Sequence, residues 1–227
     1  MRATLIIAKY PTWAIPFAVL SMAIFRIPLA LNRKISFWRL MGSGKNGSFD
    51  KEPDWHQWVI LMVHKNDPAP EQPEEFCNPK FIKDYHKLFR ANLYYHLLEP
   101  IEAHGKWNGR EVFGNFRQTG KYYGRVAVLT RATIRLSKLK AFWKNVPSVS
   151  THMKDAAGLH SSIGIGEMPL IKQATFSIWQ SKEAMLDFAY KLKEHKEVMR
   201  KTHAEKWYSE EMFVRFRIVM SGRSLPI

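Results

Sequence analysis

The sequence predicts an α+β fold in which two ferredoxin-like units with antiparallel sheets follow one another along the chain. The first observation is that the order strand, helix, strand, strand, helix, strand occurs twice in the 227 residues. The second is that a pair of glycines ends the second strand of each copy. The third is that the second helix of each copy carries a similar His-Lys segment. We therefore expect two domains, residues 1–124 with a linker and residues 125–227.

The first copy begins with a β-branched run at 4–10, which is typical of a strand. The stretch 13–31 is almost wholly apolar and predicts a helix, in which Pro16 fits the first turn and Pro28 would kink or end the helix. The remaining elements are strands at 35–44 (with Gly42 and Gly44) and 56–64, a loop at 67–79, a helix at 80–99 ended by Pro100, and a short strand around Trp107.

The second copy repeats this order. We expect strands at 125–135, 159–167, 172–179 and 212–220, a helix at 136–154 broken at Pro147, and a long helix at 182–207. Gly164 and Gly166 correspond to the glycine pair of the first copy, and HKEVMR at 195–200 echoes HKLFR at 86–90. The two sheets of such a pair can pack face to face and close a barrel-like core.

The long helix at 182–207 places a histidine on an apolar face. It contains neither proline nor glycine, and spacings of three and four put these residues on one side: Met185, Phe188, Leu192, His195, Met199 and Thr202. An imidazole among apolar neighbours needs a hydrogen-bond partner or a metal. His195 is therefore either a core histidine bonded to a carbonyl or an axial ligand that points into an apolar pocket.

Composition limits the classes of partner. The net charge of +15 suits an anionic lipid surface or an acidic redox partner, and the lack of a nucleic-acid-binding motif argues against nucleic acid. The single cysteine, Cys77, forbids an internal disulfide and fits a reducing compartment. No P-loop spacing and no nucleophile-elbow pattern occurs in the sequence.

Seven segments in series point to a known family. They are FWRLMGSG at 37–44, LTRATIR at 129–135, FW at 142–143, VP at 146–147, SIGIGEMP at 162–169, QATFSIW at 173–179, and His195 followed by KWYSEEMFVRFRI at 206–218. In these segments the sequence resembles the spheroidene monooxygenase family of carotenoid-modifying enzymes. The resemblance implies a dimeric α/β-barrel type of fold and a haem-dependent oxygenase. Such an enzyme installs a keto group in an acyclic carotenoid by successive hydroxylation, with O2 and an electron donor such as ferredoxin.

A haem oxygenase requires an axial ligand, an apolar box for the porphyrin and an open distal position. We expect His195 to ligate the iron, and Met199, Gly164 and Gly166 to contribute to the box. The glycines have a second interpretation as a strand bend or turn.

Distal candidates are polar residues on the predicted strands. Gln173 and Thr175 share one side of their strand, and Arg131 lies in the middle of another. Burying Arg131 requires an anion, which could be a haem propionate or bound oxygen, or a carboxylate such as Glu167 in a salt bridge.

The expected location is cytoplasmic, with peripheral contact on the inner face of the cytoplasmic membrane. The 13–31 helix could rest on a bilayer, and a spanning segment or a signal peptide are alternative interpretations. The functional alternatives are a haem-free protein that binds an apolar ligand, and a cofactorless monooxygenase on the same fold.

Overall fold

The computed structural model describes residues 1–45, 51–65, 79–117, 122–191, 200, 202 and 204–224, and it confirms the predicted α+β fold with antiparallel strands. The chain divides into two compact units. Unit 1 comprises residues 1–43, 53–100 and 218–227, and unit 2 comprises residues 44–52 and 101–217. The long strands Asn92–Gly105 and Tyr208–Ser224 therefore contribute to both units. The predicted division at residue 124 stays a prediction about an internal repeat.

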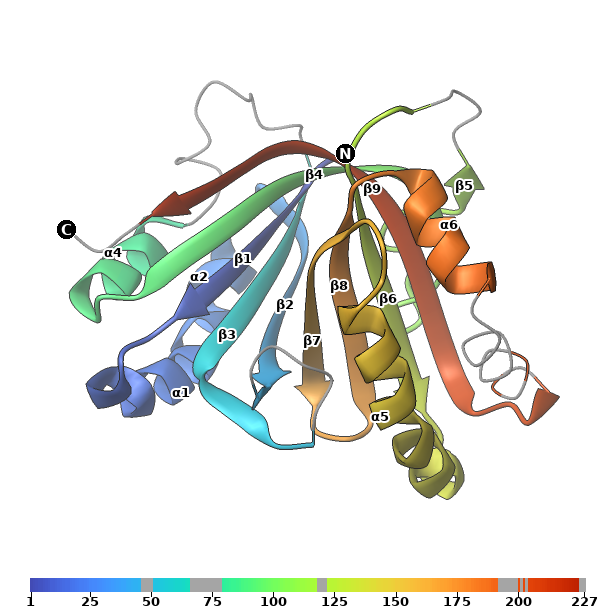
Figure 1. The fold of residues 1–227 in the computed structure, drawn as a ribbon. Coiled ribbons are helices and arrows are strands. Elements are labelled where there is room, and N and C mark those ends of the chain that lie inside the picture. The colour runs from blue at the N-terminus through green and yellow to red at the C-terminus, as the bar shows by residue number, and fades with distance from the viewer. Residues whose placement is uncertain are drawn as a thin grey trace. The chain divides into compact units, whose positions relative to one another are not determined.

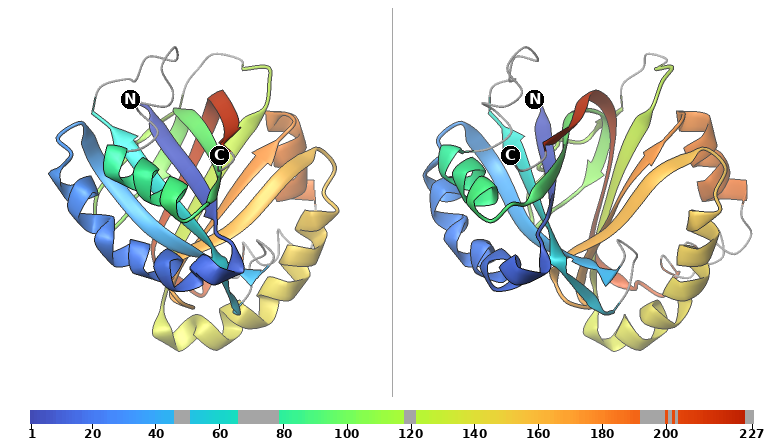
Figure 2. Two further views of the ribbon diagram at one scale, coloured as in Figure 1. Left: turned by 90° about the vertical axis from the view of Figure 1, so that its left-hand side faces the viewer. Right: turned by 60° about the vertical axis from the view of Figure 1, so that its left-hand side comes forward.

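Unit 1 has the ferredoxin-like arrangement. Its elements are β1 (Ala3–Lys9), η1 (Thr12–Ala14), α1 (Ile15–Ile24), α2 (Arg26–Leu31), β2 (Ile35–Gly44), β3 (Pro53–His64), α4 (Lys80–Leu88) and the first part of β4 (Asn92–Gly105). The strand order is β2-β3-β1-β4, and β1 pairs antiparallel with both β3 and β4. The helices α1, α2 and α4 lie together on one side of these strands (Figures 1 and 2).

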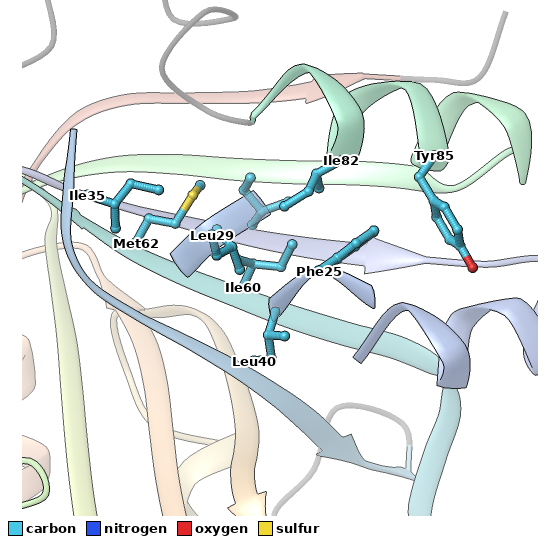
Figure 3. Close-up of a cluster of buried hydrophobic side chains, with 9 residues drawn as sticks. Phe25, Leu29, Ile35, Leu40, Ile60, Met62, Ile82 and Tyr85 are labelled. Carbon is cyan, nitrogen blue, oxygen red and sulfur yellow. The ribbon is translucent and has the colours of Figure 1, made fainter. Parts of the chain in front are cut away.

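The core of unit 1 lies between these helices and the sheet. Phe25 and Leu29 project from the α1–α2 segment onto Ile60 and Met62 of β3, and Ile82 of α4 joins them (Figure 3). Their burial follows from spacing, because positions three and four apart share one side of a helix and alternate residues share one side of a strand.

Unit 2 repeats the arrangement. Its elements are β5 (Phe116–Arg117), β6 (Val126–Ile134), η3 (Leu136–Lys138), α5 (Leu139–Lys154), β7 (Leu159–Met168), β8 (Lys172–Trp179), α6 (Lys182–Lys191) and most of β9 (Tyr208–Ser224). The strand order β7-β8-β6-β9 matches that of unit 1 position for position. Helix α6 packs against the sheet where Met185 meets Val126, Val128 and Trp179.

Four predicted elements differ from the structure. The helix predicted at 80–99 ends at Leu88, Arg90 takes a left-handed backbone conformation with φ 51°, and residues from Asn92 form β4 instead. The strand predicted around Trp107 is a single bridge between Trp107 and Arg110, next to the end of β4. Helix α5 continues through Pro147, where a break was predicted, and the apolar stretch at 13–31 is divided into η1, α1 and α2.

Other predicted elements are described only in part. The long helix predicted at 182–207 is described as α6 over its first ten residues, and positions 192–199, 201 and 203 lie outside the described residues. Most of the loop predicted at 67–79, including Cys77, also lies outside them.

Candidate active site

The sheet of unit 2 has two chemically different faces. Thr130 of β6, Thr175 of β8 and Gly164 of β7 are directly paired, so they lie in one row on one face. Gln173 and Gly166 form the next row of the same face. We call this the helix-covered face, because the α6 contacts with Val126, Val128 and Trp179 lie on it.

One end of the helix-covered face is closed by aromatic packing. Trp179 is buried, its indole N–H donates to Ser177 Oγ at 2.9 Å, and its ring lies 5.2 Å from that of Phe188 on α6. Met185 of α6 is buried against the same cluster. The described part of α6 is therefore held on this face by the apolar residues that the sequence pattern identified.

The middle of the helix-covered face is open and carries small side chains. Thr130 and Ser162 are exposed, and Thr175, Gln173 and Gly166 are half-buried, although Thr130, Thr175 and Gln173 lie on the two inner strands of the unit, β6 and β8. A flat ligand that lies against these short side chains meets little steric obstruction. The open part of this face is thus the candidate active site.

Gly166 has a local reason to lack a side chain. A Cβ at this position would lie 2.9 Å from the carbonyl oxygen of Lys172 and 3.2 Å from Nε2 of Gln173. The backbone of β8 therefore approaches Gly166 closely, in agreement with the alternative that this glycine serves a strand turn. Gly164 is buried and faces Thr175 in the adjacent strand.

The opposite face of the same sheet is a closed core with one buried ion-pair network. Arg131 is paired with Ala174, and the residue is only 2% exposed. It donates to the Glu210 carboxylate and lies 3.8 Å from Glu167, which in turn accepts a 2.6 Å hydrogen bond from the Trp107 indole. The buried positive charge is therefore neutralised inside the unit.

Glu210 is the central acceptor of this network. Burial would raise the pKa of Glu210, but the backbone N–H groups of Gly109 and Asn108 and the charge of Arg131 outweigh it, so the pKa lies below its ordinary value. Glu210 is consequently ionised at neutral pH and ties the 108–109 turn to strand β6.

The structure brings together four of the predicted site residues. Gly164, Gly166, Gln173 and Thr175 share the helix-covered face, whereas Arg131 lies on the opposite side of the sheet. His195 and Met199 lie outside the described residues, so their predicted roles stay predictions.

Two further side chains border the candidate site and were not singled out from the sequence. Thr130 is the exposed neighbour of Thr175, and strand alternation would have identified it. The His104 ring stacks 5.1 Å from that of Phe213, which is the β9 partner of Thr130. His104 lies in β4, just before the segment for which the sequence predicted a short strand around Trp107, and no pattern pointed to it.

Within the residues that the structure describes, no three or more His, Cys, Asp or Glu side chains gather in a way that could hold a metal ion. This finding concerns ions bound wholly by side chains. A haem iron takes as little as one ligand from the protein, so the absence of such a cluster does not exclude haem.

The strand order and helix placement define a ferredoxin-like α+β protein, and comparison with solved structures agrees. An aldoxime dehydratase in complex with butyraldoxime matches with a TM-score of 0.66 at 8% identity, over 100% of this chain and 82% of that one. A second aldoxime dehydratase structure has a TM-score of 0.63 at 8% identity, over 96% and 80%. At this identity the likeness shows the fold alone.

Sequence identity to two carotenoid enzymes is much higher than the identity to these solved structures. Spheroidene monooxygenase of Rhodobacter capsulatus is 32% identical over 92% of this chain and 86% of its own length. The Cereibacter sphaeroides protein of that name is 33% identical over 82% of this chain, and the match spans only 56% of that protein. No family model matches the sequence. The chain belongs to the spheroidene monooxygenase family, which supports an oxygen-using oxidoreductase of the carotenoid monooxygenase class.

Proposed function

We propose that the protein is a haem-dependent monooxygenase that introduces a keto group into an acyclic carotenoid by successive hydroxylation. The relationship to the Rhodobacter capsulatus spheroidene monooxygenase over 92% of the chain carries this proposal. The exposed, small-residue part of the helix-covered face supports the proposal that the reaction takes place on unit 2.

The described residues fit a flat, apolar cofactor on this face. Gly164, Thr175 and Thr130 form a row with little side-chain bulk, and buried Trp179 with half-buried Phe188 closes one end. When bound there, haem would supply an iron that activates O2. His195 is proposed as the residue that would ligate the iron, and Met199 as part of the apolar surroundings. The support is their place in the same three-and-four pattern as Met185 and Thr202, which are both buried.

Gln173 and Thr175 are the polar residues proposed to hydrogen-bond oxygen at the reacting centre. Gln173 Nε2 lies 3.3 Å from the Met168 carbonyl, so it is held at the β7–β8 turn, and Thr175 presents a hydroxyl beside it on the same face. Each can donate a hydrogen bond to an oxygen atom above the sheet. Arg131 is proposed only as a positioning residue, because Glu210 and Glu167 engage its guanidinium on the other face.

Both oxidations take place at the same carbon of the substrate. One O2, two electrons and two protons convert a methylene to a secondary alcohol and water, and a second equivalent of each gives a geminal diol. Loss of water from the diol leaves the ketone. The four electrons come from an external donor such as ferredoxin, and the net charge of +15 favours an acidic one.

The test is haem content measured by the Soret band of the purified protein. We expect His195→Ala to lose the band, and His203→Ala and His104→Ala to keep it. His104 is exposed beside the candidate site, so it controls for the loss of any nearby imidazole.

A His195→Ala protein with an unchanged Soret band would contradict the assignment of the ligand. Carotenoid oxidation by a protein that never binds haem would instead favour a cofactorless monooxygenase. A haem-free protein that binds the carotenoid without oxidising it would favour a binding role.

A further inference from the structure

The N-terminal helical segment of unit 1 is apolar on both of its sides. One side packs into the core through Ala14, Ala18, Ser21, Phe25 and Leu29. The other side exposes Trp13, Phe17, Val19, Leu20, Ile27 and Leu31. A helix with apolar residues all round is expected to be covered on every side, so the exposed side calls for a partner.

Helix α4 extends this apolar surface. The Phe17 and Phe89 rings stack at 4.2 Å, and Phe25 meets Phe81 edge-on at 6.5 Å, so α4 lies directly beside α1 and α2. Phe81 and Leu88 of α4 are exposed as well. Figure 2 shows the green α4 beside the blue helical segment formed by α1 and α2. We call this set the apolar surface of unit 1: Trp13, Phe17, Leu20, Ile27, Leu31, Phe81 and Leu88.

Positive charge surrounds the apolar surface of unit 1. No aspartate or glutamate precedes Asp50 in the sequence, and Arg26, Arg33 and Lys34 are exposed at the ends of α2. In α4 the exposed charged residues are Lys80, Lys83 and Lys87 against Asp84. An apolar helical face bordered by lysine and arginine is complementary to a bilayer that carries anionic lipid.

We infer that the apolar surface of unit 1 docks into the headgroup region of an anionic lipid bilayer without crossing it. The stretch Thr12–Leu31 is long and apolar enough to span a membrane. However, Phe25 and Leu29 are each 1% exposed within the core of unit 1, and spanning would pull both of them out of that core. Docking keeps them in place and buries only the exposed side. Trp13 and the surrounding lysine and arginine side chains are residue types that favour the membrane–water interface.

The test is flotation of the full-length protein with phosphatidylcholine vesicles that contain or lack phosphatidylglycerol. We expect flotation with the anionic vesicles, weakened by salt, and release by carbonate. Leu31→Glu should lower the partition coefficient by about tenfold or more, because one exposed leucine no longer enters the interface. Arg33→Ala should weaken binding to anionic vesicles alone.

The matched control is Leu136→Glu in η3 of unit 2, because Leu136 is 71% exposed and Leu31 is 75% exposed. We expect the control to float like the unchanged protein. Absence of flotation at low salt, an equal loss in both variants, or release by detergent alone would each overturn the inference. A dimer that Leu31→Glu converts to a monomer would assign the surface to a second copy of the chain and also overturn it.

This inference rests on exposure and charge in unit 1 and not on the proposed chemistry in unit 2. Haem content and flotation are therefore independent measurements. A protein that floats but lacks haem would contradict only the proposed function, and a haem protein that does not float would contradict only the docking.

Discussion

His86 is a buried histidine whose position affects stability rather than the candidate site. It lies between the rings of Tyr10 at 5.8 Å and Phe25 at 5.3 Å, and burial lowers its pKa to about 3. The sequence favours a structural role for His86 over a ligand role, because its helix carries competing apolar stripes through Phe81 and Ile82. Unit 1 surrounds His86 with aromatic side chains, and the exposed side of its helix carries lysines.

The low pKa of His86 predicts acid-sensitive stability. The folded protein keeps His86 neutral down to about pH 3, whereas the unfolded chain binds a proton below its ordinary pKa of about 6.5. The unfolded state therefore gains protons first as the pH falls, and this group lowers the free energy of unfolding by about 2 kcal/mol between pH 8 and pH 5.

Denaturant unfolding at both pH values measures this effect. We expect His86→Phe, which keeps a ring in place, to show a smaller difference between pH 8 and pH 5 than the unchanged protein. An identical pH difference in the two proteins would mean that another group is responsible.

Arg131 shows why a site residue cannot be assigned from strand position alone. The sequence indicated that a buried arginine needs an anion but left open whether the anion is a ligand or a carboxylate. Glu210 and Glu167 supply carboxylates from sequence positions far from Arg131. The face on which Arg131 lies depends on its register with Ala174, which no single-sequence pattern specifies.

Removal of Glu210 should leave a buried charge without its main partner. We expect Glu210→Ala to lower the free energy of unfolding by about 3 kcal/mol or more, because the Arg131 guanidinium is almost fully buried. Adding Arg131→Met to Glu210→Ala should recover part of the loss. The measurement is chemical denaturation of the single and double variants.

The matched control for Glu210 is Glu52, whose pair with Lys45 is 2.7 Å long but mostly exposed. Glu52→Ala should cost less than about 1 kcal/mol. If Glu210→Ala were no more destabilising than Glu52→Ala, the network around Arg131 would contribute little to stability.

At the scale of elements, the sequence predicted most strands and the starts of α4 and α6 correctly. The main error was the helix at 80–99, because the segment from Asn92 has apolar residues that satisfy both a helical and a strand pattern. Pairing with β1 decides between them, and that pairing is a tertiary effect. Pro100 does not interrupt the strand because it lies beyond the last residue paired with β1, Leu98.

The candidate site was predictable to the extent that it follows strand alternation. Gly164, Gly166, Gln173 and Thr175 were each placed on a strand from the sequence, and the register of β7 with β8 brings them together. The open centre of the face around Thr130 could not be predicted, because exposure in the middle of a sheet depends on where α5 and α6 lie.

At the scale of the whole molecule, each unit depends on chain segments from the other half of the sequence. Unit 1 includes the end of β9, where His96 Nδ1 and Ser221 Oγ lie 2.8 Å apart. Unit 2 includes residues from 101 onward, and among them Trp107 and Phe113 are fully buried. A cut at residue 124 would therefore remove part of the core or sheet of both units.

We accordingly predict that residues 1–124 and 125–227 do not fold as separate domains. The second fragment loses Trp107, which donates to Glu167, and Phe113, which packs edge-on against Phe216 at 5.2 Å. Loss of one buried aromatic side chain costs about 3–5 kcal/mol, and a whole domain is stable by only about 5–15 kcal/mol. Each fragment alone should lack a cooperative thermal transition by circular dichroism. Mixing the two should restore it, because together they supply every strand of both units. Cooperative unfolding of the 125–227 fragment by itself would show that the predicted repeat boundary is also a domain boundary.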